Sequence, residues 1–372
     1  MSSIPQPAAP HVRERFGDRL RNFWQRVSEG RQIDDLWKQF AADARAGYGF
    51  YGREVDWESI QKLPHWRRPL HIMRQFFWAM LLKMSAARRV LLLVAFVMMF
   101  DARTQFFAVL LFLILLMLEL ADKVTMKRDL EIAREIQSWL VPSFPPEVAG
   151  ADIAFSTRPQ NSVAGDYYDA FFPNAEAGAD SKLMVVIADV VGKSIPAALL
   201  MATLQASLRT IAGEGAPLAD LVARLNRYAC AHSQDGQRFT TAVLAEYEPQ
   251  ARRLTYVNAG HNAPILRRAA ATLEKLEVGG MPLGIDAAEI YETACVEMQP
   301  GDALIFYTDG VVEAFNDKHE EFGNERWFRA IRALPVVMNA QESLQFLMKP
   351  VDEFVGVTHQ SDDITYLVMR CK

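Results

Sequence analysis

The chain has 372 residues, of which 51% are hydrophobic and 23% charged, a composition that fits about two folded domains and excludes wholesale disorder. Its net charge of −5 is uneven, because residues 1–89 carry 16 Lys and Arg against 9 Asp and Glu while the remainder is acidic. A basic leader ahead of an acidic body favours a membrane-facing segment joined to a cytosolic domain. It argues against a nucleic-acid-binding protein, whose basic excess would extend over the folded domain.

The cysteines and the opening stretch indicate the compartment. Cys230, Cys295 and Cys371 lie far apart without CxxC spacing, which favours reduced thiols over a disulfide framework or a zinc site. The opening stretch MSSIPQPAAPHVRERFGDRL mixes charges and prolines, and the apolar run of a signal peptide does not follow it. Residues 1–85 are therefore expected to form a basic region that is helical and partly disordered.

Residues 86–121 hold the most apolar part of the chain, in which VLLLVAFVMMF and FFAVLLFLILLMLEL are separated only by DARTQ. Neither run reaches the roughly 20 residues that span a bilayer comfortably, but with their flanks both become short possible spans, over 86–102 and 104–121. A tight hairpin would put the basic residues before and after it on one side, with both termini in the cytoplasm. We therefore expect two short helices in the cytoplasmic membrane and the rest of the chain in the cytosol. The alternatives are a pair of buried core helices or an in-plane anchor.

Residues 122–142 are predicted to form a linker helix. Apolar residues recur at steps of three and four, as at Ile132, Ile136 and Trp139, and form an amphipathic stripe, and Pro142 ends the pattern. A helix that lies on its own domain and a parallel dimer helix that carries a signal from the membrane explain the stripe equally well, because few clean heptads are visible.

From residue 143 to 372 the pattern changes to strands, such as DIAFSTR, LMVVIAD, LTYVNAG and ITYLVM, with helical patterns only at 195–213, 217–230, 324–333 and 341–355. The connectors EPQARR and AGHNA are too short for crossover helices, so the strands on either side of each are expected to pair antiparallel. Strands that are apolar throughout need both faces covered, which predicts two packed sheets with helices outside.

Acidic residues stand where several of these strands meet a turn. MVVIAD ends at Asp189 and LIFYTD at Asp309, Asp166 directly precedes an apolar run, and Asp362 and Asp363 open the last strand. An ionised carboxylate at such a place is costly unless a positive charge meets it, and no Lys or Arg is adjacent to Asp166 or Asp309. Each acid alone fits an Asx turn, but the set favours a divalent-cation site, since Asp oxygens are preferred ligands of Mg²⁺ and Mn²⁺.

The stretch from about 129 to 371 resembles the SpoIIE/RsbU-like bacterial branch of the metal-dependent, PPM-type (protein phosphatase 2C-like) Ser/Thr phosphatases. The matching segments, in chain order, are LEIAREIQSWLVP, SVAGDYYDAF, IADVVGKSIPAALLM, FTTAVLAEY, LTYVNAGHNAPIL, GGMPLGI, GDALIFYTDGVVEAFN, FGNERW and SDDIT. The resemblance implies an α/β (α+β) fold, a four-layer α-β-β-α sandwich with two mainly antiparallel sheets, preceded here by the helical membrane-associated region.

The resemblance also implies a site in which two Mn²⁺ or Mg²⁺ ions are held by Asp166, Asp189, Asp309, Asp362 and the backbone carbonyl of Val190. Asp363 is the rival of Asp362, since the acid pair allows a shift of one residue. The sequence departs from the family pattern at Ala164, where a first glycine usually stands, and at Ser194, which replaces the second glycine of a turn.

The activity that the resemblance implies is hydrolysis of phosphoserine or phosphothreonine by metal-activated water, on a regulatory partner such as a STAS-type anti-sigma-factor antagonist. The linker helix would allow a homodimer, and no nucleic acid is expected as a partner. A catalytically weak receptor of the same fold is the alternative. A metal-dependent nuclease or cyclase would share the acids, but the domain lacks a basic groove and a nucleotide-binding glycine loop.

Other polar residues carry weaker hypotheses. His261, in NAGHN, is expected to satisfy the backbone of its turn rather than to act as an acid or base, with Asn258 and Asn262 organising the same turn. Lys193 fits either a phosphate contact or a solvated turn. Asp169 fits either a residue that supports the metal ligands or an exposed one.

Overall fold

The computed structural model describes residues 64, 67–174, 181–192, 194–233, 238–358 and 360–372. They belong to two compact units, one ending at Asp122 and the other running from Lys123 to Lys372. Most of the predicted basic region 1–85 lies outside the described residues, as does Lys193.

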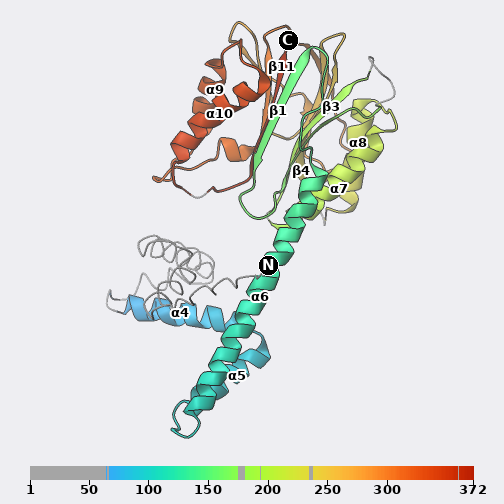
Figure 1. Ribbon diagram of the computed structural model, residues 1–372. Helices are drawn as coiled ribbons and strands as arrows, with labels where there is room; N and C mark the ends of the chain where they lie inside the picture. The colour runs from blue at the N-terminus through green and yellow to red at the C-terminus, as the bar shows by residue number, and fades with distance from the viewer. Residues whose placement is uncertain (1–63, 65–66, 175–180, 193, 234–237, 359) are drawn as a thin grey trace, which may run out of the picture. The chain divides into compact units, whose positions relative to one another are not determined.

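The first unit contains helix α4 (Arg68–Lys83), helix α5 (Ala86–Met98) and the first part of helix α6 (Gln105–Leu140) (Figure 1). The Thr104 hydroxyl donates to the carbonyl of Met98 at 2.7 Å and closes the turn between α5 and α6. At the other end of this hairpin, Arg88 pairs with Asp122 at 2.6 Å and with Glu119 at 3.2 Å. Helices α5 and α6 thus form a hairpin, and α6 continues without a break through most of the residues expected to form the linker helix.

The hairpin leaves large apolar side chains exposed on both arms. Small or branched residues, Ala95, Ala108 and Leu115, are buried in it, while the exposed set includes Leu93, Phe96, Val97, Phe106, Val109 and Leu116. At 13 residues α5 is only about 20 Å long, against a hydrocarbon core of about 30 Å. By length and composition, a single described helix, α7 (Ile195–Ala212), could cross a membrane. Because Met201 and Leu208 of α7 are fully buried against a sheet, its apolar character is that of a core helix.

Two sheets form the centre of the second unit. One has the order β1-β11-β10-β6-β7, with all pairs antiparallel, and consists of β1 (Ala151–Arg158), β6 (Ile265–Arg267), β7 (Leu273–Lys275), β10 (Ala303–Tyr307) and β11 (Ile364–Cys371). The other has the order β2-β3-β4-β5-β8, with β9 also paired to β5. It consists of β2 (Asp166–Phe171), β3 (Leu183–Val190), β4 (Thr240–Glu248), β5 (Arg253–Ala259), β8 (Gly279–Gly280) and β9 (Ala294–Glu297), and only β5 and β8 run parallel.

The two sheets pack face to face, with a pair of helices over each outer face. Along β10, Leu304 and Phe306 point into the core between the sheets, while Ile305 points to the opposite face, as the two-residue period of a strand requires. Helices α9 (Gly323–Arg332) and α10 (Ala340–Val355) cover the β10 sheet, and α7 and α8 (Leu218–Ala231) cover the other (Figure 1). The predicted four-layer α-β-β-α sandwich is thereby confirmed.

One predicted strand pairing is wrong. EPQARR joins β4 and β5, which pair antiparallel as expected, but the strands joined by AGHNA do not pair with each other. β5 belongs to one sheet and β6 to the other, where β6 pairs with β10 and β7. A short connector also suits a chain that steps from one packed sheet to the other, and periodicity alone does not distinguish the two cases.

A buried ion pair joins α7 to the sheet beneath it. Asp169 on β2 is completely buried and receives two hydrogen bonds from Arg209, from Nε and Nη2, each at 2.9 Å. The Tyr167 hydroxyl donates a third at 2.6 Å, and the Arg209 guanidinium lies over the Phe171 ring at 3.8 Å. Burial raises the pKa of Asp169, and the bonds from Tyr167 and Arg209 act against that shift. Asp169 is therefore a structural residue, and the exposed alternative is excluded.

We expect Arg209→Ala to lower the free energy of unfolding of the second unit by about 3 kcal/mol, because it leaves a buried carboxylate without its cation. Arg209→Lys keeps the charge but loses the two-point contact, so a smaller loss is expected. Urea unfolding measures both, with Arg227→Ala, an exposed arginine of α8, as the matched control. A variant Arg209→Ala as stable as the Arg227→Ala control would contradict this role.

Candidate metal centre

Two of the predicted ligands face each other on adjacent strands. β2 and β3 pair antiparallel, and Asp166 stands directly opposite Asp189 in their register. Side chains in such a pair have Cβ atoms about 5 Å apart, and two like charges there destabilise a sheet. Asp166 is 4% exposed, so water does little to screen this repulsion. The pair therefore favours either protonation of one carboxylate or a cation beside the two.

The Asp166 carboxylate is held from the neighbouring sheet by two hydroxyls. Thr308, after β10, donates to Oδ2 at 2.9 Å, and Thr365, on β11, donates to the same oxygen at 2.5 Å. Burial and then the negative charge of Asp189 raise the pKa of Asp166 well above its usual range, although the two hydroxyls act in the opposite direction. A bound cation would favour the ionised form of this carboxylate.

Gly165 brings the first acid close to the end of β3. A Cβ atom at this position would lie 3.2 Å from the carbonyl oxygen of Val190 and 3.7 Å from Oδ1 of Asp189. The backbone before Asp166 thus runs against both the predicted carbonyl ligand and the second acid, and a glycine permits this close approach. Ala164, the departure from the family pattern, precedes this contact and leaves it intact.

The acid pair at 362–363 divides into two roles. Asp363 is 9% exposed, and its carboxylate accepts from the backbone N–H groups of Gln160 and Gly165, each at 2.6 Å. Asp362 is less buried, and its Oδ1 accepts from the N–H of Asp363 at 2.9 Å. Asp363 therefore fixes the loop before Asp166 to the start of β11, with both of its oxygens engaged.

Asp309 is placed by the close packing of two turns. It opens a short 3₁₀ helix, η2 (Asp309–Val311), and a Cβ atom on Gly310 would lie only 2.0 Å from the carbonyl oxygen of Asp363. The turn that carries Asp309 thus lies directly on the turn that carries Asp362. The ends of β2 and β3 from one sheet and of β10 and β11 from the other meet at this place.

The donor set fits a hard divalent cation. Its side chains and the Val190 carbonyl offer only oxygen atoms, which Mg²⁺ and Mn²⁺ prefer. The structure brings Asp166 and Asp189 together as cross-strand neighbours and places Asp363 within electrostatic range of Asp166. Asp309 and Asp362 lie on the two adjoining turns. In the described part of the chain, no group of three His, Cys, Asp or Glu side chains already has the spacing of an assembled metal site.

Sequence reasoning missed a glutamine that touches this loop. Gln137, on the last turns of α6, donates from Nε2 to the carbonyl of Ala164 at 2.7 Å and accepts from the N–H of Ala164 at 2.9 Å. One amide side chain thus satisfies both backbone groups of a residue two positions before Asp166. In the sequence Gln137 only lies beside the apolar stripe of the predicted linker helix, so nothing in the pattern itself pointed to the contact.

His261 has the structural role that the sequence indicated. Its N–H donates to Oδ1 of Asn258 at 2.8 Å, the Asn258 amide donates to its carbonyl at 3.0 Å, and its ring Nδ1 lies 2.8 Å from the Thr241 hydroxyl. Burial lowers the pKa of His261 to about 4. The imidazole is therefore neutral at neutral pH and is not a store of protons for a leaving group.

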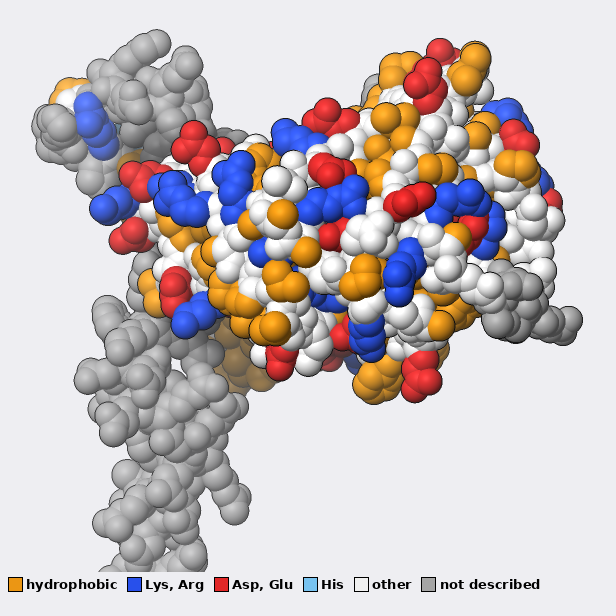
Figure 2. All heavy atoms as spheres, turned by 90° about the horizontal axis from the view of Figure 1, so that it is seen from above, with side chains coloured by type: hydrophobic (Ala, Val, Ile, Leu, Met, Phe, Trp, Pro, Cys, Tyr) orange, Lys and Arg blue, Asp and Glu red, His pale blue; other side chains and the backbone are white. Residues whose placement is uncertain are grey.

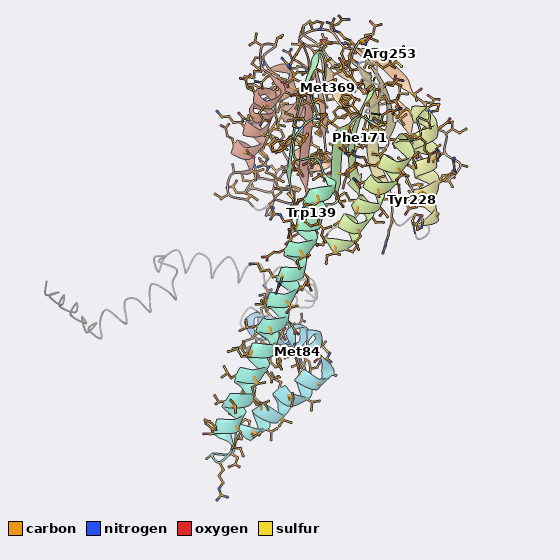
Figure 3. All side chains as sticks on the ribbon, turned by 45° about the vertical axis from the view of Figure 1, so that its right-hand side comes forward. Met84, Trp139, Phe171, Tyr228, Arg253 and Met369 are labelled. Carbon is orange, nitrogen blue, oxygen red and sulfur yellow. The ribbon has the colours of Figure 1, made fainter. Side chains whose placement is uncertain are left out.

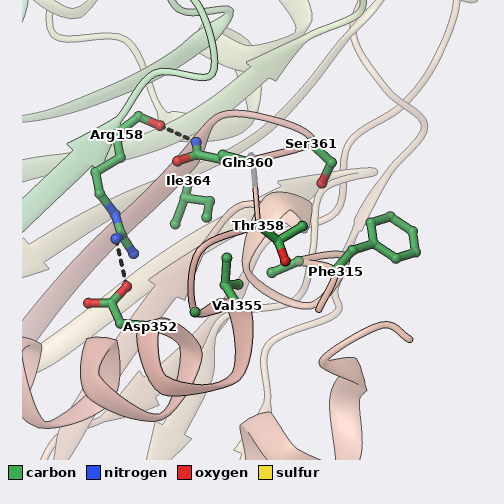
Figure 4. A pocket seen from close by; sticks show the side chains of 10 residues that line it. Arg158, Phe315, Asp352, Val355, Thr358, Gln360, Ser361 and Ile364 are labelled. Atoms are coloured by element: carbon green, nitrogen blue, oxygen red, sulfur yellow. Dashed lines mark hydrogen bonds and ion pairs between the residues drawn. The ribbon is translucent and has the colours of Figure 1, made fainter. Parts of the chain in front are cut away.

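Two cavities adjoin the centre. One, of about 270 Å³, lies beside the loop that carries Asp362; Arg158 pairs there with Asp352 at 2.6 Å, and Gln360 donates to the Arg158 carbonyl at 2.6 Å (Figure 4). The other, of about 400 Å³, lies between the end of α6 and strands β1 and β2, and Asp166 forms part of its wall. We call the second one the α6 cavity.

On the face of the molecule drawn in Figure 2, the described residues do not form a basic patch of the kind that binds nucleic acid. On the face drawn in Figure 2, Lys and Arg side chains alternate with Asp and Glu side chains. A nucleic-acid interface requires positive charge gathered on one side. This face therefore gives no support to the nuclease alternative.

The pKa of His261 generates a pH-dependent stability. Its folded value of about 4 lies below the ordinary value of 6.5, so below pH 6.5 the unfolded chain takes up a proton that the folded chain refuses. The contribution of the neutral His261 to the free energy of unfolding is therefore fully present above about pH 6.5 and is lost progressively as the pH falls toward 4. We expect wild type to lose about 2 kcal/mol more than His261→Gln between pH 7.5 and 5 in urea unfolding. Equal losses in the two proteins would show that His261 titrates normally.

Comparisons with known proteins identify the family. The profile of the family "Stage II sporulation protein E (SpoIIE)" matches residues 179–372. The phosphoserine phosphatase RsbU of Bacillus subtilis is 30% identical over 188 residues, which cover 50% of this chain and 54% of RsbU. Protein IcfG of Synechocystis is 26% identical over 277 residues, covering 68% of this chain and 42% of IcfG. The chain thus spans about half the length of these relatives.

Among solved structures, the SiaA-PP2C domain of Pseudomonas aeruginosa superimposes with a TM-score of 0.58 at 20% identity, covering 68% of this chain and 99% of that domain. This likeness concerns the fold alone. Since the family profile covers more than half of the sequence and the two-sheet sandwich agrees with it, the chain belongs to the Stage II sporulation protein E (SpoIIE) family.

Proposed function

We propose that this chain is a metal-dependent protein Ser/Thr phosphatase that hydrolyses phosphoserine or phosphothreonine on a regulatory partner. The observation that carries the proposal is the buried Asp166 opposite Asp189, at a point where strand ends from both sheets meet. The relative RsbU, which is named a phosphoserine phosphatase, supports the choice of substrate group.

In this proposal Asp166, Asp189, Asp309, Asp362 and the carbonyl of Val190 hold two Mn²⁺ or Mg²⁺ ions. The chemistry that such a pair supplies is activation of a water molecule and neutralisation of charge on the phosphoryl group. Asp363 is assigned the role of positioning the loop before Asp166, because both of its oxygens already accept backbone N–H groups. Thr308 and Thr365 orient the Asp166 carboxylate from the other sheet.

The chain's own residues favour direct attack by water over a covalent enzyme intermediate. Of the cysteines, Cys295 lies on β9 and Cys371 at the end of β11 that is remote from Asp362, while burial raises the pKa of Cys230. A thiol with a raised pKa is a poor nucleophile. Because His261 is neutral, the departing seryl oxygen would take its proton from water.

For the partner, we propose a phosphorylated regulator of the STAS-type anti-sigma-antagonist class, on the strength of the likeness to RsbU. A homodimer through residues 122–142 is supported by exposed apolar side chains on α6, where Ile132 is 46%, Ile136 48% and Trp139 72% exposed. Trp139 lies on the part of α6 nearest the sandwich (Figure 3). These residues recur at helical spacing, as a helix-to-helix contact requires.

We further propose that the α5–α6 hairpin anchors the chain in the cytoplasmic membrane, with the phosphatase unit in the cytosol. Exposed apolar side chains on both arms support this, since water does not favour so large an apolar surface. The ion pairs of Arg88 with Glu119 and Asp122 join the two ends of the hairpin, where it would leave the membrane. The basic residues at 88–89 and 127–128 fit the cytoplasmic side.

The catalytic proposal is tested by hydrolysis of a phosphoserine peptide with and without Mn²⁺. We expect turnover that requires the metal, and a loss of at least about 100-fold in kcat for Asp189→Asn and Asp362→Asn, because each removes a charge that holds a cation. Arg227→Ala is the control. Equal rates in wild type and Asp189→Asn, with and without Mn²⁺, would contradict the proposed phosphatase activity and favour the catalytically weak receptor.

The anchoring proposal is tested by fractionating cells that produce the full chain or a variant lacking residues 86–121. We expect the full chain in the membrane pellet, resistant to carbonate extraction, because an inserted hairpin is not released by removing charge interactions. The variant is expected in the supernatant, with its Mn²⁺-dependent turnover retained. If both proteins pellet equally, or both remain in the supernatant, the hairpin is not the anchor.

A further inference from the structure

We propose that the α6 cavity receives the substrate segment beside the phosphoserine, and that Arg134 selects an acidic side chain in that segment. This specificity role rests on the proposed function, since it assumes that the phosphoserine is presented to the acids around Asp166. It names a determinant of substrate choice on the helix that precedes the sandwich.

The cavity connects the predicted metal ligands with this helix. Its wall includes Asp166 on one side and Arg134, Gln137 and Ser138 of α6 on the other, and its volume is about 400 Å³. That space holds one or two side chains of a peptide. A segment whose phosphoserine reaches Asp166 would therefore run along the end of α6.

The described wall of the α6 cavity combines apolar side chains with a few polar groups and one cation. Among the described residues that line it, only Arg134 and Asp166 are charged, and its other polar groups include hydroxyls of Ser138, Ser156 and Thr157. Asp166 is assigned to the metal, so Arg134 is left to meet the substrate. A guanidinium recognises carboxylate or phosphate groups.

The position of Arg134 along α6 indicates which of these groups it contacts. Gln137 contacts Ala164, which lies two residues before Asp166. Arg134 lies three residues before Gln137 on α6, which places its backbone about 4.5 Å farther along the helix axis. Successive peptide residues are about 3.8 Å apart. The backbone of Arg134 is therefore offset along α6 by about the length of one peptide residue, which suits a side chain that flanks the phosphoserine.

Arg134 is exposed and available for such a contact. Within the described residues no ion pair of Arg134 is found, and the nearby Glu131 pairs instead with Lys127 at 3.9 Å. Arg128, on the same helix, is also exposed but does not line the cavity. It provides a matched control for the effect of charge alone.

The test measures binding in the full chain carrying Asp189→Asn, which prevents turnover. Fluorescent phosphoserine peptides, identical except that both residues next to the phosphoserine are Glu, Gln or Lys, are titrated in detergent with Mn²⁺ present. With Arg134 we expect the Glu peptide to bind about fivefold more tightly than the Lys peptide, the upper range for an exposed ion pair. Arg134→Gln should remove the preference, and Arg134→Glu should reverse it.

Three results would overturn the proposal. The first is an unchanged peptide preference in Arg134→Glu. The second is an equal change in Arg128→Glu, which would assign the effect to general charge. The third is an equal loss of affinity for all three peptides in Arg134→Gln, which would show that Arg134 binds the phosphoryl group instead of the flanking side chain. A failure of the phosphatase itself is distinguishable, because the chain without Asp189→Asn would then show no Mn²⁺-dependent turnover of any peptide.

Discussion

The candidate metal centre depends on two carboxylates that face each other across adjacent strands. Asp166 and Asp189 stand in register on β2 and β3, and Asp166 is almost fully buried. In such surroundings repulsion between like charges is strong, so the arrangement is stable only when protons or cations offset the charge. Protonation would neutralise the pair without giving its oxygens a role in catalysis, whereas divalent cations would use the same oxygens as ligands. The other features of the centre follow from this choice.

The surrounding residues hold the backbone in place rather than adding charge. Asp363 binds two N–H groups of the loop before Asp166, and Gln137 binds both backbone groups of Ala164 in the same loop. Gly310 lets the turn with Asp309 lie against the carbonyl of Asp363. The loop is therefore fixed from the sheet on one side and from α6 on the other. Any movement of the last turns of α6 acts directly on the backbone that presents Asp166.

Much of the sandwich and several of the candidate metal ligands could be predicted from the sequence, because its motifs occur in a recognisable order. The strand ends at Asp189 and Asp309 and the helices of the sandwich were recognisable from apolar runs bounded by turns. The partner of β6 was not, since a short connector is compatible both with a hairpin and with a step between sheets. The split between Asp362 and Asp363 and the contact of Gln137 depend on which backbone groups come together in three dimensions, and neither periodicity nor spacing encodes that. The boundary predicted at 121–122 does not coincide with a helix end, because the residues on both sides of it are good helix formers and α6 continues across it.

The central claim is that the acids at the strand ends form a binding site for two divalent cations. The most direct measurement is the number of Mn²⁺ ions bound by the metal-stripped full chain, obtained from the electron paramagnetic resonance signal of free Mn²⁺ during titration. We expect two ions per chain in wild type, and the loss of at least one in Asp166→Asn. A wild-type chain that binds no more Mn²⁺ than Asp166→Asn would contradict the account.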